Sequence, residues 1–195
     1  MFDFILAMSL IEIFGLITGA LAVWLLIKQN IWTWPVGIAY IAASLYIFYS
    51  ARLYADFAVH IFYLIMSFYG WYYWLKGGNR AESTLPVSRE NNQTLLILLA
   101  VCAIVVFISG TLFATYTDAD LPYWDNTTSI LSLLAMWLQS RKKLESWALW
   151  LLIDILAVGI YFYKEIYFYS FLYTLYIGMA FMGYIAWHKS YRNEQ

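Results

Sequence analysis

The sequence predicts an all-α, polytopic membrane protein with seven transmembrane helices. Of its 195 residues, 64% are hydrophobic and 21% are aromatic, whereas 12% are charged. A soluble domain of this size cannot bury so much apolar surface, but lipid can surround it. The apolar residues also fall in runs close to the roughly 17–25 residues that cross a bilayer, and polar segments separate these runs.

The predicted helices follow one another along almost the whole chain. Their expected ranges are 5–27, 34–50, 54–75, 94–115, 125–139, 146–163 and 166–187. Pro35 suits the first turn of the second helix, where its missing N–H costs little. The segment 76–93 is polar and contains Gly and Pro, so we expect an aqueous linker there. The N-terminal residues lack the basic region of a signal peptide and are expected to be helical.

The basic residues predict that the N-terminus lies outside and the C-terminus in the cytoplasm. Cytoplasmic loops carry an excess of lysine and arginine. In this orientation the outer loops hold only Arg52 and Lys164 of the 11 basic residues. The inner segments hold Lys28, Lys76, Arg80, Arg89, Arg141, Lys142, Lys143, Lys189 and Arg192. A net charge of −1 gives no electrostatic basis for binding nucleic acid, and the lone Cys102 gives no disulfide or metal spacing.

An internal repeat is the next signal. Residues 24–76 align without a gap on residues 137–189, and eleven positions are identical, among them Trp34 with Trp147 and Gly70 with Gly183. We expect these glycines to permit close helix packing. The repeat divides the chain into a first three-helix half (1–75), a cytoplasmic linker with a central helix (76–115), and a second three-helix half with a short cytoplasmic tail (116–195).

Three helices in each half, with one linking helix, make the repeat parallel. This 3+1+3 arrangement is that of the SWEET-type transporters, related by an axis along the membrane normal. In such designs the substrate binds between the halves, near mid-membrane. A duplicated membrane domain without a nucleotide-binding loop or a metal cluster indicates transport rather than catalysis.

The segment "SWALWLLIDIL" (146–156) places Asp154 about eight residues into a predicted helix, which is about 12 Å deep. A lone carboxylate there costs about 2.5–3.5 kcal/mol. Trp147, Trp150 and Asp154 share one helix face through their i, i+3, i+7 spacing. Indole and carboxylate together suit a cationic aromatic ligand. The alternatives are that Asp154 pairs with another intramembrane polar group, and that Trp147 is an interfacial anchor.

A second polar stripe lies on the predicted helix 54–75. Asp56, His60, Tyr63 and Ser67 follow i, i+4, i+7, i+11 spacing and share a face, so they are candidate substrate contacts. Asp56, near the outer end, is either a secondary contact or a cap, and His60 is either a ligand contact or a hydrogen-bonded core histidine. No second histidine lies nearby, so a metal site is not expected.

Aromatic residues mark two further candidates. Tyr123 and Trp124 precede the predicted helix 125–139 and are either interfacial anchors or an outer gate. Trp34, the counterpart of Trp147 in the first half, is a secondary candidate. No sequence feature calls for a cofactor.

Four segments resemble the Pnu-type vitamin transporters, the PnuC family. They are "NIWTWPVG" (30–37), "LYADFAVHIFYLIMSFYGWYYW" (53–74), "PYWDNTTS" (122–129) and "SRKKLESWALWLLIDI" (140–155). The resemblance covers nearly the whole chain in the family's order. It implies a SWEET-related homotrimer in a bacterial inner membrane, with one site per protomer. It also implies facilitated diffusion of a vitamin that a cytoplasmic kinase then phosphorylates and traps.

The resemblance places the family's binding residues at Trp147, Trp150 and the polar positions of the third and sixth helices. The family's nicotinamide riboside transporters carry glutamine at the position of His60 and asparagine at that of Asp154. An acid and an imidazole instead suit thiamine, with its thiazolium cation and aminopyrimidine, which transporters of the PnuT branch carry. We therefore expect thiamine, with nicotinamide riboside as the close alternative. An ion-coupled carrier or a membrane receptor is the other functional class.

Overall fold

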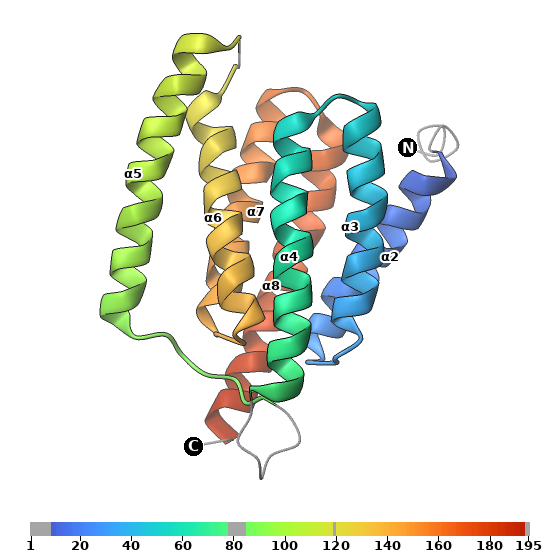
Figure 1. The fold of residues 1–195 in the computed structure, drawn as a ribbon, viewed down its shortest axis with the longest axis vertical. Helices are drawn as coiled ribbons and strands as arrows, with labels where there is room; N and C mark the ends of the chain where they lie inside the picture. The colour runs from blue at the N-terminus through green and yellow to red at the C-terminus, as the bar shows by residue number, and fades with distance from the viewer. Residues whose placement is uncertain (1–8, 78–84, 119, 194–195) are drawn as a thin grey trace. The chain divides into compact units, whose positions relative to one another are not determined.

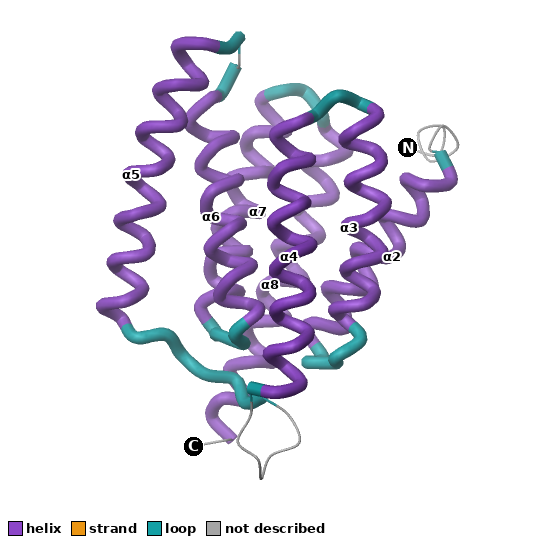
Figure 2. Tube along the Cα trace, viewed as in Figure 1, coloured by secondary structure: helices purple, strands orange, loops and turns teal. Residues whose placement is uncertain are grey.

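The computed structural model describes residues 9–77, 85–118 and 120–193, and within these ranges it is all-helical (Figures 1 and 2). The helices are α2 (Leu10–Ile27), α3 (Thr33–Ser50), α4 (Tyr54–Lys76), α5 (Asn92–Tyr116), α6 (Pro122–Ser140), α7 (Glu145–Tyr163) and α8 (Tyr167–Asn193). They correspond one to one with the predicted helices. The main difference is that α8 continues to Asn193 instead of ending at 187. Residues 5–8 of the first predicted helix lie outside the described residues, and α2 begins at Leu10.

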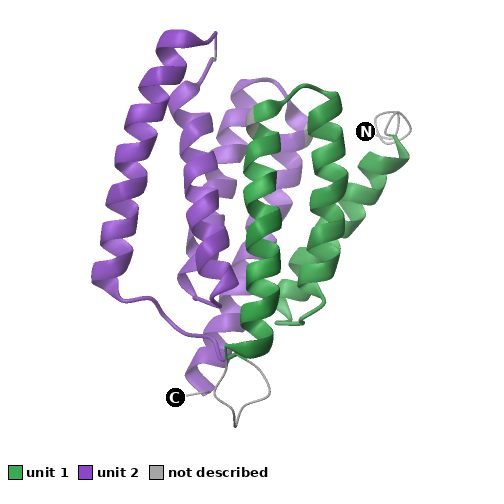
Figure 3. Ribbon diagram, in the orientation of Figure 1, with its two compact units in different colours: residues 1–85 green, residues 86–195 purple. Residues whose placement is uncertain are grey.

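The chain forms two compact units, residues 1–85 and 86–195 (Figure 3). In the first unit α2 packs on α3 and α3 on α4; in the second, α5, α6, α7 and α8 pack in the same sequential way. The division places the central helix α5 in the same unit as the second three-helix half. Within each unit, short connections join neighbouring helices, so consecutive helices run antiparallel, as in an αα-hairpin (Figure 1).

Among the described residues, four stretches are long and apolar enough to cross a membrane: Leu10–Ile27, Asn92–Tyr116, Glu145–Tyr163 and Tyr169–Asn193. Large apolar side chains such as Leu96, Phe107 and Leu112 of α5 are more than half exposed. Such an exposed apolar surface is unfavourable in water and suits lipid.

The turns between helices repeat the same backbone geometry in both units. Gln29 and Lys142 adopt left-handed φ angles of 54° and 57°, and Arg52 and Glu165 both adopt 59°. In each turn the next amide nitrogen lies 2.8–2.9 Å from the carbonyl oxygen five residues earlier, which is the hydrogen bond of a Schellman C-cap. In the alignment of 24–76 with 137–189, Gln29 lies opposite Lys142 and Arg52 lies opposite Glu165.

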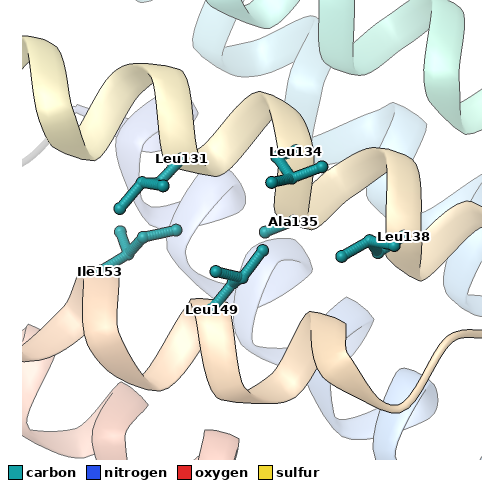
Figure 4. Close-up of a cluster of buried hydrophobic side chains, with 6 residues drawn as sticks. All are labelled: Leu131, Leu134, Ala135, Leu138, Leu149 and Ile153. Atoms are coloured by element: carbon teal, nitrogen blue, oxygen red, sulfur yellow. The ribbon is translucent and has the colours of Figure 1, made fainter. Parts of the chain in front are cut away.

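The core of the second unit lies between α6 and α7. Leu149 and Ile153 of α7 point toward the apolar face of α6 (Figure 4). The buried α6 residues of this cluster are Leu131, Leu134, Ala135 and Leu138. Burying each such side chain contributes about 1.5–3 kcal/mol relative to exposing it in water. This packing fixes the face of α7 that carries the candidate site residues.

Near its end, the expected aqueous linker forms hydrogen bonds with the α6–α7 turn and with the start of α7. Ser88 forms a parallel β-bridge with Lys143 in the α6–α7 turn, and the Leu144 amide donates to the Ser88 carbonyl at 2.9 Å. Glu145, at the start of α7, lies 3.1 Å from the Arg89 guanidinium and accepts from the Glu90 amide at 3.0 Å. The described residues 86–91 therefore pack on the second unit.

Candidate functional site

Asp154 of α7 is only 6% exposed. No hydrogen bond or ion pair joins its carboxylate to any residue that the structure describes. An isolated buried charge costs several kcal/mol, so such a group favours a cation or a hydrogen-bond donor beside it. The predicted alternative, a polar partner within the chain, is not found among the described residues.

Trp150 lies one turn before Asp154, on the same face of α7. Its ring is partly buried against the α6–α7 core cluster. Its Nε1 donates a hydrogen bond to Oε1 of Gln139 on α6 at 2.7 Å. This indole therefore has a satisfied polar edge and a fixed place beside the acid.

Trp147 has a different environment. It is 2% exposed and packs edge-to-face on Trp187, with ring centroids 5.5 Å apart. A Cβ built on Gly183 of α8 would overlap the Trp147 ring. The ring thus fills the space left by a glycine, which confirms the expected close packing at Gly183.

Trp34 repeats this arrangement in the first unit. It is also 2% exposed, packs edge-to-face on Trp74 at 5.3 Å, and occupies the space where a Cβ of Gly70 would lie. The shared geometry of Trp34 and Trp147 indicates that both tryptophans pack helices together. A binding role for either one stays a prediction.

The polar stripe of α4 lies in the first unit. His60 is 9% exposed, and its ring lies among Tyr40, Phe48 and Tyr63 at centroid distances of 6.2, 4.7 and 5.2 Å. Its Nδ1 lies 2.9 Å from the carbonyl oxygen of Asp56. A carbonyl only accepts hydrogen bonds, so Nδ1 carries the proton and, in the neutral ring, Nε2 is an acceptor.

The other end of His60 is unsatisfied. Its Nε2 is buried and has no hydrogen-bond partner among the described residues. Ser67, further along α4, is 2% exposed, whereas the Asp56 side chain is exposed. The stripe therefore presents a buried acceptor at His60, and both predictions for this residue, ligand contact and core histidine, remain open.

Tyr123 and Trp124 open α6. The Tyr123 ring lies where a Cβ of Gly110 on α5 would be, and its hydroxyl is 3.2 Å from Oγ1 of Thr111. Trp124 is 53% exposed. Tyr123 thus packs α6 on α5, while Trp124 is free to act as an anchor or a gate.

Sequence reasoning missed two polar residues of α6. Gln139 bonds Trp150, and Asn126 donates from Nδ2 to the Val106 carbonyl at 3.1 Å and to Oγ of Ser109 at 2.6 Å. The only sequence signal for Gln139 is the repeat, which aligns it with Leu26. In the described part of the chain, no three His, Cys, Asp or Glu side chains gather into a group that could hold a metal.

Comparison with known proteins finds a family and relatives whose sequences match almost the whole chain. The family described as "Nicotinamide mononucleotide transporter" matches residues 9–189. The chain is 28% identical to the nicotinamide riboside transporter PnuC of Escherichia coli K12, over 96% of this chain and 88% of the relative. It is 26% identical to the riboflavin/roseoflavin transporter RibM of Streptomyces davaonensis, over 94% of this chain and 84% of that one.

A solved structure shares the fold. The crystal structure of the vitamin B3 transporter PnuC superposes with a TM-score of 0.74 and 22% identity, covering 93% of this chain and 82% of that one.

Proposed function

The chain belongs to the nicotinamide mononucleotide transporter family, and from this premise we propose that it carries thiamine across the membrane. Its relatives are vitamin transporters and not enzymes, so the chain is a membrane-embedded vitamin transporter. The observation that carries the choice of a cationic substrate is the buried carboxylate of Asp154, which has no partner among the described residues.

The chemistry of this face favours a cation with an aromatic ring. The carboxylate of Asp154 attracts a positive charge and accepts hydrogen bonds only. The indole of Trp150, held one turn away, offers a face for stacking and for cation–π attraction, which contributes about 2 kcal/mol when desolvated. Thiamine supplies a fixed cation, a second aromatic ring, and an amino group whose N–H bonds can be donated to the acid.

Nicotinamide riboside is the second candidate. The Escherichia coli relative, which matches 96% of this chain, is named for it, and its pyridinium ring is also a cation. Its ribose hydroxyls both donate and accept, so an amide would serve them at least as well as the acceptor-only Asp154. The acid therefore favours thiamine, and a direct comparison of the two ligands decides between them.

The wider architecture of the proposal comes from the repeat and the charge distribution. We infer seven spans in a 3+1+3 parallel repeat, with the N-terminus outside and the C-terminus in the cytoplasm. The recurrence of turn geometry at equivalent positions supports the repeat. Transport is by facilitated diffusion through a homotrimer, and a cytoplasmic kinase traps the vitamin. The proposed binding residues are Trp147, Trp150, Asp154, His60, Tyr63 and Ser67.

Calorimetry of the purified protein tests the substrate. Titration with thiamine, nicotinamide riboside and riboflavin is expected to show the tightest binding for thiamine. Asp154→Asn removes a charge-assisted interaction worth about 1.5–3 kcal/mol, so affinity should fall roughly 10- to 100-fold. Asp118→Asn, an exposed acid outside the site, is the matched control. Unchanged affinity in Asp154→Asn, with the fold intact, contradicts the assignment of the acid.

Uptake into liposomes tests the mechanism. Facilitated diffusion predicts that labelled thiamine enters until its concentrations are equal on both sides, without any imposed gradient. Accumulation beyond that point when a proton or sodium gradient is applied would instead indicate an ion-coupled carrier. Binding without any uptake would indicate a receptor.

A further inference from the structure

We propose that Gln139 is a positioning residue for the substrate site, acting through the indole of Trp150. The inference rests on the proposed function, because it takes Trp150 to be a binding residue. Gln139 lies in the last turn of α6, and Trp150 lies in the second turn of α7. Their hydrogen bond spans the two helices, from indole Nε1 to amide Oε1, at 2.7 Å.

The chemistry of the two groups fixes the direction of this bond. An indole N–H only donates, so the amide oxygen must face it. The Gln139 amide nitrogen then points away and lies 3.9 Å from the sulfur of Met136, a weak acceptor. The amide therefore has one strong bond among the described residues, and that bond fixes the edge of the Trp150 ring.

The repeat shows that this pair is specific to the second unit. Gln139, Trp150 and Asp154 align with Leu26, Gly37 and Ile41. Leu26 and Ile41 are each 4% exposed and belong to the apolar core of the first unit. The first unit thus builds the same helix pair without the amide, the indole or the acid. The amide, the indole and the acid are therefore three differences between the second unit and the first, and they lie on the same helix pair.

Their joint occurrence argues that the hydrogen bond serves the site and not helix packing. Packing of α7 is already provided by the core cluster of six apolar residues. A tryptophan held only by apolar contacts can rotate about χ1 and χ2, and fixing such a side chain on binding costs affinity. With its N–H bonded to Gln139, the ring is already held in one orientation beside Asp154.

The test measures thiamine and nicotinamide riboside binding to purified Gln139→Met, which keeps the length of the side chain but removes the acceptor. We expect roughly 3- to 10-fold weaker binding of whichever ligand the wild type binds. Gln139→Glu, which keeps an oxygen at the same place, should restore binding to within about twofold. Gln93→Met, at an exposed position of α5, is the matched control.

A double-mutant cycle separates positioning from a structural role. Trp150→Phe keeps an aromatic ring but removes the donor, so Gln139→Met should have no further effect on affinity in that background. An equal loss in both backgrounds would show that Gln139 acts independently of the indole, and would overturn the proposal. If Gln139→Met does not fold, Gln139→Asn, whose shorter amide cannot reach the indole, takes its place in the cycle.

The outcomes distinguish this inference from the proposed function. If Trp150→Ala weakens binding and Gln139→Met binds like the wild type, the positioning role is wrong and the site stands. If Trp150→Ala itself binds like the wild type, Trp150 is not a binding residue and the site assignment is wrong. Both results can be read from the same titrations.

Discussion

Replacing Gly183 by alanine tests the packing of α8 on α7. The added Cβ would overlap three carbon atoms of the six-membered ring of Trp147. That ring is 2% exposed and is held edge-to-face by Trp187, which is fully buried. Neither ring has room to withdraw, so the helices must separate or the side chains must leave their preferred rotamers.

Two opposing terms set the magnitude. Alanine is better than glycine inside a helix by about 1 kcal/mol. Overpacking a filled core costs about 1–3 kcal/mol, and overlap with three atoms of a fully enclosed ring favours the upper end. The net loss is about 2 kcal/mol, which for a chain of this size corresponds to about 4–8 °C in the thermal midpoint. The midpoint is measured on detergent-purified protein at one fixed heating rate, since such unfolding is often irreversible.

The chain offers its own control for this substitution. Gly178 lies on the same helix, and a Cβ there would meet nothing within 4 Å. Gly178→Ala should therefore leave the midpoint unchanged or raise it slightly. Trp147→Phe removes the overlapping ring atoms, so Gly183→Ala should cost little in that background. A midpoint for Gly183→Ala equal to that of Gly178→Ala would refute the packing argument.

Three further predictions use the same thermal assay. Gly70→Ala should lower the midpoint as much as Gly183→Ala, because its Cβ would overlap the equivalent ring of Trp34; a neutral result would contradict the shared geometry. Glu145→Ala should lower the free energy of unfolding by about 1–3 kcal/mol, because this 13% exposed side chain also accepts a hydrogen bond from the Glu90 amide. Arg89→Ala should lower it by under about 1 kcal/mol, because the Arg89 side chain is 57% exposed. Equal losses for the two substitutions would contradict this reasoning. Asn126→Leu should cost about 1–2 kcal/mol through two lost hydrogen bonds, and Ser109→Ala less, because the bond to the Val106 carbonyl remains.

The helices were predictable because their signal is local. Apolar runs and the polar residues between them gave every described helix, mostly to within three residues at each end. The start of the first predicted helix, residues 5–8, lies outside the described residues, and α2 begins at Leu10. The largest difference among the described residues is the end of α8, where the helix continues to Asn193 through a polar stretch. Backbone hydrogen bonding continues there after the apolar run has ended, so hydropathy gives no signal for those last residues.

The linker and the turns show what the sequence does not reveal. Ser88 and Lys143 are 55 residues apart, and nothing in either segment indicates that they pair. The left-handed turn residues include Gln29 and Glu165, where glycine would be the usual signal. The Ser88–Lys143 pairing depends on where the α6–α7 turn lies, and the turn geometry at Gln29 and Glu165 depends on how the helices joined there pack. A single sequence specifies neither.

The candidate site was predictable where residue chemistry conflicts with its expected surroundings. Asp154 stood out because a carboxylate is costly in an apolar helix, and the structure places it in a buried position without a described partner. Gln139 did not stand out, because a glutamine near a helix end is common on protein surfaces. Its bond to Trp150 depends on the register of two helices, which only the structure provides.

Comparison of the two units distinguishes residues that pack the helices from candidate residues for substrate binding. Trp34 and Trp147 agree in sequence, burial, ring partner and glycine contact, so their common task is one that both units need, the packing of neighbouring helices. Trp150 and Asp154 have no chemical counterpart in the first unit, although the helix pair forms there without them. Because the first unit has Ile41 at the position of Asp154, this difference supports the proposed role of the acid in binding the substrate. Trp150 and Asp154 therefore have a stronger claim to substrate contact than Trp147, which the same spacing had placed beside them.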